Sequence, residues 1–248
     1  MPTAIEFRNV SLKIADGRLL LDAIHLKIEE GTTTAILGRS GSGKTTLLRM
    51  ANRMVKPTSG SIYLRGEDNQ NLDPIQMRRG MGYVIQETGL FPHFTVARNV
   101  GLVPELSGTR ISEAKTSELL AHVGLDDGKF AQRYPHQLSG GQRQRVGLAR
   151  ALAADPSILL MDEPFGALDP LTRAEMQDML RGLLARLRKT VLLVTHDLDE
   201  ALYLASRIVL VEEGRLITDV AAGDFLRSEL PEVKAYAQAF HRGEKARS

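Results

Sequence analysis

Residues 38–45 read Gly38-Arg39-Ser40-Gly41-Ser42-Gly43-Lys44-Thr45. The stretch matches G-x-x-x-x-G-K-[ST], a loop in which backbone N–H groups surround phosphate oxygens. It follows the apolar run 34–37, which is typical of a buried strand, and it leads into a segment of helical composition. Because a helix N-terminus adds partial positive charge, we expect Lys44 to reach the β and γ phosphates of a nucleotide and Thr45 to ligate Mg²⁺. A glycine-rich turn without a ligand is the alternative, and the complete pattern in this setting disfavours it.

Two carboxylates, Asp162 and Glu163, follow the apolar run 158–161. Open α/β sheets bind their ligands at the carboxyl ends of the strands. We expect Asp162 to hold Mg²⁺ through water, and Glu163, on the other side of the pleat, to polarise the water that attacks the γ-phosphate. Two solvated acids at a strand end are the alternative for such a pair taken by itself.

A second glycine-rich segment reads Leu138-Ser139-Gly140-Gly141-Gln142 and precedes a helix predicted to begin near Arg143. Ser139 and Gln142 fit a capping box, which does not explain the two glycines. Bare backbone N–H groups at a positive helix end predict a second phosphate-binding surface. Since residues 38–45 already hold the phosphates of one nucleotide, this surface is most useful to the nucleotide of a neighbouring molecule.

The remaining sequence predicts alternating strands and helices. Alternating or short apolar runs predict strands, and longer runs with helical spacing predict helices. The predicted strands are 5–10, 19–28, 34–37, 81–85, 158–161, 190–195 and 207–211, and the predicted helices are 111–123, 143–154, 172–189, 224–228, 232–242 and one starting at 44. This alternation predicts an α/β fold with a mainly parallel sheet covered on both faces, and residues 87–154 are predicted to form an inserted helical lobe.

Composition and charge exclude several classes of protein. The 248 residues are 43% hydrophobic and 25% charged with no cysteine, which argues against disordered and disulfide-stapled chains. The net charge is only +2, which does not fit a nucleic-acid binder. Arg143, Arg145 and Arg150 are compatible with anion binding, but we expect them to lie on a solvated helix face. The longest apolar runs fall far short of a bilayer span, so no membrane crossing is expected.

The three motifs, in this order, resemble those of the nucleotide-binding subunit of an ABC transporter, and the resemblance covers almost the whole chain. It implies a P-loop NTPase (RecA-like) core with an N-terminal antiparallel β subdomain and an inserted α-helical subdomain, all in one domain. The expected division is 1–86 with 155–218 for the core and β subdomain, 87–154 for the helical subdomain and 219–248 for a helical tail.

The same resemblance implies roles for further residues. Residues 38–45 and the adjoining Thr46 would bind ATP, and residues 138–142 would contact the ATP of a second copy. Gln86 matches the glutamine that contacts Mg²⁺ or the attacking water, and His196 matches the histidine that contacts the γ-phosphate. Asp169 matches an aspartate that crosses the dimer interface, although Asp169-Pro170 also fits a helix start.

One position departs from the family pattern. The family usually places an aromatic residue that stacks on adenine shortly after the first strand, and the register of residues 9–14 puts Ile14 there. Aliphatic contact recovers only part of the stacking energy. We therefore expect Ile14 to contact the base and to discriminate weakly in favour of adenine.

The resemblance implies an ATP- and Mg²⁺-dependent ATPase of a bacterial ABC importer. It would pair with a second copy of itself, dock on separate integral-membrane permease subunits and indirectly serve a solute-binding protein at the cytoplasmic face of the inner membrane. Residues 82–106 are similar to ATPases of glycine betaine and choline importers, so the expected solutes are osmoprotectants. An importer for another solute, such as amino acids, and a non-transport ABC ATPase are the alternatives. Phe91 and Phe94 either meet a permease helix or pack inside the helical lobe.

Overall fold

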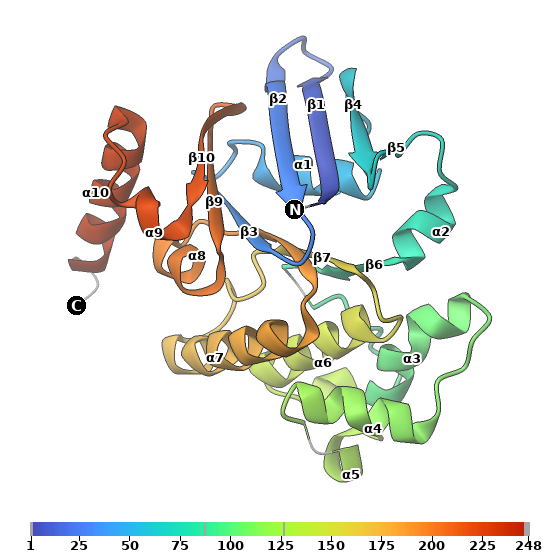
Figure 1. Cartoon of the computed structure of the whole chain (residues 1–248). Coiled ribbons are helices and arrows are strands. Elements are labelled where there is room, and N and C mark those ends of the chain that lie inside the picture. Colours follow the sequence, from blue (N-terminus) through green and yellow to red (C-terminus); the bar gives the residue numbers. More distant parts are fainter. Residues whose placement is uncertain (1, 87, 126, 246–248) are drawn as a thin grey trace. The chain divides into compact units, whose positions relative to one another are not determined.

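The computed structural model describes residues 2–86, 88–125 and 127–245. The chain divides into two compact units, residues 1–74 with 190–248 and residues 75–189, which are described separately below (Figure 1). The functional division into core, helical subdomain and tail, with its boundaries at 86, 154 and 218, stays a prediction.

An antiparallel sheet forms the beginning of the first unit. It contains β1 (Thr3–Lys13), β2 (Leu19–Glu29), β4 (Ser59–Leu64) and β5 (Glu67–Asp68) in the order β2-β1-β4-β5. Hydrophobic residues of β1 and β2, such as Phe7 and Leu26, pair across the strands and are buried. The antiparallel β subdomain expected at the N-terminus is therefore confirmed.

Parallel strands form the centre of the first unit. β3 (Thr33–Leu37) pairs in parallel with both β8 (Thr190–Val194) and β9 (Arg207–Glu212). Most of β3 and all of β8 are buried, as expected for strands covered on both faces. Because β3 and β8 run in parallel, their carboxyl ends lie at the same edge of the sheet, where residues 38–45 and His196 follow them.

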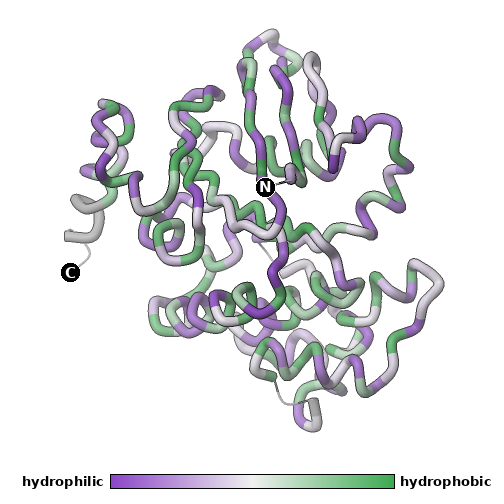
Figure 2. The backbone as a smooth tube through the Cα atoms, in the orientation of Figure 1, coloured by the Kyte–Doolittle hydropathy of each residue, from purple (hydrophilic) through white to green (hydrophobic). Residues whose placement is uncertain are grey.

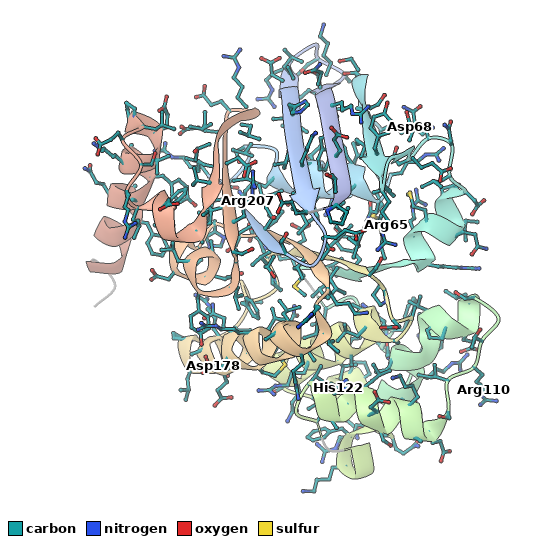
Figure 3. All side chains as sticks on the ribbon, in the orientation of Figure 1. Arg65, Asp68, Arg110, His122, Asp178 and Arg207 are labelled. Atoms are coloured by element: carbon teal, nitrogen blue, oxygen red, sulfur yellow. The ribbon has the colours of Figure 1, made fainter. Side chains whose placement is uncertain are left out.

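The helices of the first unit are α1 (Lys44–Ala51), α8 (Leu198–Leu204), α9 (Ala222–Phe225) and α10 (Pro231–Lys245). An additional strand, β10 (Arg215–Ala221), runs antiparallel to β9. Arg207 lies at the start of β9 (Figure 3). Its guanidinium joins the two strands by donating to both carboxylate oxygens of Asp219, one of them at 2.8 Å, and this pairing raises the pKa of Arg207.

The second unit combines two parallel strands with the expected helical segment. β6 (Met81–Val84) pairs with β7 (Ile158–Asp162). The helices are α2 (Pro74–Arg79), α3 (Val96–Leu106), α4 (Glu113–His122), α5 (Asp127–Phe130), α6 (Gly140–Leu152) and α7 (Pro170–Leu187), with a 3₁₀ turn at Pro135–Gln137. Helix α6 contacts β6, α3, α4 and α7, so it is the central helix of this unit.

Hydrophobic and hydrophilic residues alternate along the helices, as expected for helices that bury one face (Figure 2). In the part of the chain that the structure describes, no helix combines the length and the apolar character that a bilayer crossing needs. The α/β class is confirmed, with an antiparallel sheet and mainly parallel pairing among the other strands.

Candidate functional site

The loop at residues 38–45 is packed so tightly that two of its positions exclude a side chain. A Cβ on Gly38 would lie 2.1 Å from the Val211 carbonyl oxygen and 2.7 Å from the Ser42 hydroxyl. At Gly43 the backbone is left-handed, with φ of 99°, and a Cβ would lie 2.6 Å from a methyl carbon of Leu21. These glycines are therefore required by the close approach of the loop to β2 and β9.

Lys44 and Ser42 present polar atoms inside this loop. Lys44 is 5% exposed, and its ammonium donates to the carbonyl oxygens of Gly38 and Arg39, each at 2.8 Å. The Ser42 hydroxyl is also buried and has no hydrogen-bond partner among the described residues. Gly43, which caps α1, supplies no side-chain cap to the helix N-terminus. A buried cation, an unpaired hydroxyl and an uncapped helix end fit an anionic, oxygen-rich ligand such as a phosphate chain.

His196 lies at the same sheet edge in this unit. The Thr195 N–H donates to the Ile36 carbonyl oxygen at 3.2 Å, which continues the pairing of β8 with β3 to the residue before His196. Asp197 then caps α8 by accepting from the Glu200 N–H at 3.0 Å. The exposed His196 side chain therefore stands between a fixed strand end and a capped helix.

Ile14 lies immediately after β1. Its N–H donates to the Arg18 carbonyl oxygen at 3.0 Å, and its carbonyl oxygen accepts from the Gly17 N–H at 2.9 Å. These bonds close the turn that joins β1 to β2, and the Ile14 side chain is half-buried there. Contact between Ile14 and a nucleotide base stays a prediction.

The second unit holds the two acids and Gln86. Asp162 ends β7, is 3% exposed, and lies 3.5 Å from the Tyr83 hydroxyl. The Gln86 amide donates to a Glu163 carboxylate oxygen at 3.2 Å. Because β6 and β7 are parallel neighbours, with Val84 opposite Met161, the residues that follow them meet at one edge. The sequence analysis singled out Asp162, Glu163 and Gln86 but not Tyr83, and their roles stay predictions.

The backbone of Glu163 corrects one expectation. The strand ends at Asp162, and Glu163 adopts a left-handed conformation with φ of 45°. Its carbonyl oxygen accepts from the Gly166 N–H at 3.2 Å. The direction of the Glu163 side chain is therefore set by a turn and not by the strand pleat. Such unfavourable backbone conformations concentrate at functional sites.

The segment 138–142 forms the start of α6, which begins at Gly140 and therefore earlier than predicted. The Ser139 hydroxyl accepts from the Gln142 N–H at 3.2 Å, and the Ser139 N–H donates to the Gln142 side-chain oxygen at 2.9 Å. This confirms the capping box. The hydroxyl hydrogen of Ser139 is not used by the capping bond and is available to an acceptor.

The structure shows that Gly140 and Gly141 differ in the space around them. A Cβ on Gly141 would lie 2.5 Å from a methyl carbon of Thr172, so packing against α7 requires that glycine. A Cβ on Gly140 would meet nothing closer than 4.0 Å, and Gly140 is exposed. Packing therefore does not explain Gly140, whose backbone lies at the exposed start of the helix beside the capping box.

The expectation of a solvated arginine face on α6 was wrong. Arg143 donates to the Leu138 carbonyl oxygen at 2.7 Å, and Arg145 donates to that of Val123 at 3.0 Å. Arg150 donates to two carbonyl oxygens of residues 88–89, and burial lowers its pKa. These guanidinium groups tie loops of the second unit to α6, and Arg143 supports the segment 138–142 directly.

Asp169 is the N-cap of α7, with Pro170 at the first helical position as the sequence predicted. Its carboxylate accepts from the Thr172 N–H at 3.1 Å, and hydrogen bonds from Thr172 lower the pKa of Asp169. Leu171 beside it is 72% exposed. The sequence analysis did not identify this exposed apolar side chain at the start of α7.

A cavity of about 240 Å³ brings parts of the second unit together. It is lined by Gln86, Thr88, Gly140, Arg143, Gln144, Pro164, Ala167 and Leu168. The Gln144 amide nitrogen is buried and has no hydrogen-bond partner among the described residues. The residues that follow β6, the start of α6 and the turn after β7 therefore line the same cavity.

Comparisons with known proteins agree on one family. A family model described as ABC transporter matches residues 21–166. The glycine betaine uptake system ATP-binding protein YehX of Escherichia coli is 49% identical over 216 residues, covering 86% of this chain and 69% of that protein. The choline transport ATP-binding protein OpuBA of Bacillus subtilis is 44% identical over 230 residues, covering 92% of this chain but only 60% of its own length.

A solved structure shows the same architecture. It is a dimeric, post-hydrolysis state of the ATP-binding cassette MJ0796 bound to ADP and Pi, with a TM-score of 0.78 and 33% identity. The match covers 88% of this chain and 98% of the solved one. On the sequence match, the motifs and the fold together, the chain belongs to the ABC transporter family.

Proposed function

We propose that this chain is the ATP-hydrolysing subunit of an ABC importer that takes up quaternary-amine osmoprotectants. Two copies pair head to tail, and residues 38–46 of one copy and residues 138–142 of the other hold one ATP between them. The buried Lys44 ammonium beside the unpaired Ser42 hydroxyl is the observation that carries the proposal, because it fits a phosphate chain.

The residues proposed to bind the phosphates and Mg²⁺ have distinct tasks. Lys44 binds the β and γ phosphates, and the N–H groups of residues 38–46 bind their oxygens. Thr45, Gln86 and Asp162 would hold Mg²⁺, because hydroxyl, amide and carboxylate oxygens are the ligands that suit an ion usually bound by one or two carboxylates and substrate phosphates. When bound there, Mg²⁺ would offset negative charge on the phosphates.

Three polar groups act at the γ-phosphate. Glu163 accepts a proton from the attacking water, whose oxygen forms the new bond to phosphorus as the bond to ADP breaks. Gln86, already 3.2 Å from the Glu163 carboxylate, orients that carboxylate and the water. His196 contacts the γ-phosphate from the sheet edge that it shares with residues 38–45.

The second copy completes the site. Ser139 and the exposed N–H groups near Gly140 bind the same γ-phosphate from the opposite side. Asp169 and the exposed Leu171 meet the partner copy at the interface. Hydrolysis removes the γ-phosphate bridge, so the pair opens, which is a ligand-switched transition between two states.

Residues 88–99 of the second unit offer a surface for the permease. The Phe91 and Phe94 rings lie 5.3 Å apart, and the Arg98 guanidinium lies 3.9 Å from the centre of the Phe94 ring. The fully buried Asn99 side chain bonds both the N–H and the carbonyl oxygen of Phe91. Phe91 is nevertheless 42% exposed, so the loop is held by Asn99 and still presents an aromatic ring to its surroundings.

A variant at Ile14 tests whether this residue contacts the adenine. Replacing Ile14 with tyrosine is expected to raise ATP affinity about fivefold, because base stacking contributes about 1 to 3 kcal/mol and aliphatic contact supplies only part of it. Binding of ATP and GTP to both proteins measures the change. No gain in ATP affinity for the variant contradicts the contact between Ile14 and the base.

Co-purification and uptake test the transport role. The tagged chain, extracted with detergent from membranes of cells that make it, is expected to retain an integral-membrane protein. After reconstitution with the matching solute-binding protein, uptake of labelled glycine betaine or choline should need ATP and should be lost with Lys44→Ala. Absence of any membrane partner contradicts the importer, whereas uptake of an amino acid instead contradicts only the choice of solute.

A further inference from the structure

A hydrogen bond links the C-terminal helix to the residue proposed to contact the γ-phosphate. The Tyr236 hydroxyl, on α10, donates to the backbone carbonyl oxygen of His196 at 2.9 Å. Forty residues separate the two in sequence, and both belong to the first unit. Nothing in the proposed function gives α10 a task, so this contact calls for its own explanation.

Helix α10 is held firmly enough to fix the position of that hydroxyl. Val233 of α10 is 1% exposed and belongs to a core cluster with Phe225 of α9, Leu198 of α8 and Leu37 of β3. Tyr236 packs against the same cluster. Figure 1 shows α10, in red, next to α9 on the β10 side of the unit. The Tyr236 ring is therefore anchored by apolar packing, and its hydroxyl is a fixed donor.

The residues on both sides of His196 are fixed by other contacts. Thr195 is bonded to β3 through its N–H, and its side-chain oxygen accepts from the Asp197 N–H at 3.0 Å. Asp197 is the N-cap of α8. The bond from Tyr236 acts on the peptide unit between these two points. It therefore restrains the backbone rotation that would swing the exposed imidazole.

We infer that Tyr236 is a positioning residue for His196, and that the docking of α10 against the core sets where the imidazole stands. The inference rests on the proposed contact of His196 with the γ-phosphate. Tyr236 is assigned no contact with the nucleotide. It acts by holding the His196 peptide in the orientation that the reaction uses, so its loss affects the chemical step more than nucleotide binding.

Tyr236→Phe tests this with little disturbance to packing, because the ring stays in place and only the hydroxyl is lost. The expected result is a kcat for ATP about three- to tenfold below that of the wild type, the factor that corresponds to one neutral hydrogen bond, with KM unchanged. Tyr203→Phe is the matched control, since Tyr203 lies on α8 in the same unit and is 38% exposed. That control should keep the wild-type kcat.

A double-mutant cycle separates positioning from a general loss of stability. In a His196→Ala background, Tyr236→Phe should cause no further fall in kcat, because the group that Tyr236 positions is already absent. A merely structural effect would lower kcat by the same factor in both backgrounds. Hydrogen exchange provides a second readout, with faster exchange expected at residues 195–198 in Tyr236→Phe but not in Tyr203→Phe.

The outcomes distinguish this inference from the proposed function. If Tyr236→Phe has the same kcat and the same exchange rates as the wild type, while His196→Ala is impaired, only the role of Tyr236 is overturned. If Tyr236→Phe lowers kcat by the same factor in the wild-type and His196→Ala backgrounds, the role of Tyr236 is overturned as well. No ATP turnover by the wild type, or full turnover by His196→Ala, contradicts the proposed site itself.

Discussion

Replacing Glu163 with glutamine is expected to lower kcat for ATP by about 10²- to 10⁴-fold, the usual contribution of a general base. ATP affinity should stay near that of the wild type, because glutamine has the same shape and keeps an oxygen that accepts from Gln86. Since closure needs only bound ATP, the variant should accumulate an ATP-dependent dimer. Turnover assays and the molar mass in solution with and without ATP measure both effects.

A matched control is present elsewhere in the chain. Glu213 is an exposed glutamate that also has a left-handed backbone, with φ of 47°, and no assigned task. Glu213→Gln makes the same chemical change in the same backbone conformation and should keep wild-type turnover. If Glu163→Gln hydrolyses ATP at a near-normal rate, Glu163 is not the base.

The Ser139→Arg variant is expected to lose ATP turnover by about 100-fold or more, the scale seen when donors to a developing charge are removed. A large cation at the exposed start of α6 would prevent this segment from meeting the nucleotide of the partner copy. ATP binding by the isolated monomer should change little, since residues 38–46 are untouched. Equilibrium binding and steady-state turnover on the same preparation separate the two effects.

Loss of the helix cap by itself must be controlled. Ser112 caps α4 in the same way, accepting from the Lys115 N–H at 3.1 Å, and it is also exposed. Ser112→Arg should therefore cost a similar amount of stability, about 1 kcal/mol, without loss of turnover. Full turnover by Ser139→Arg, or an equal loss in Ser112→Arg, would refute the proposed contact across the dimer.

Local rules explain what the sequence predicted well. The strand, glycine loop and helix around Lys44 depend on neighbouring residues only, as do the capping box at Ser139 and the N-cap at Asp169. These features need no knowledge of distant partners. The structure places Gln86 and Glu163 within hydrogen-bond distance, as expected for residues that follow parallel neighbouring strands.

Other features depend on contacts that a local pattern does not contain. Strand β10 pairs with β9 and was not predicted, and α3 contains Pro104, which normally argues against a helix. Arg150 looked solvated because its carbonyl partners at residues 88–89 are about sixty residues away in sequence. The bond from Tyr236 to His196 is of the same kind. Such pairs become visible only when the segments are placed in space.

The central claim is that residues 38–45 of one copy face residues 138–142 of another across a shared ATP. Because the sequence has no cysteine, single thiols can be placed without competing reactions. One copy carries Arg39→Cys and the other Ser139→Cys, at two exposed positions, both in the Glu163→Gln background. With ATP and Mg²⁺, mild oxidation is predicted to join the two different copies, and without ATP it should not. If no crosslink between the two copies forms with ATP, while ATP binding and dimer formation persist, the shared site does not exist.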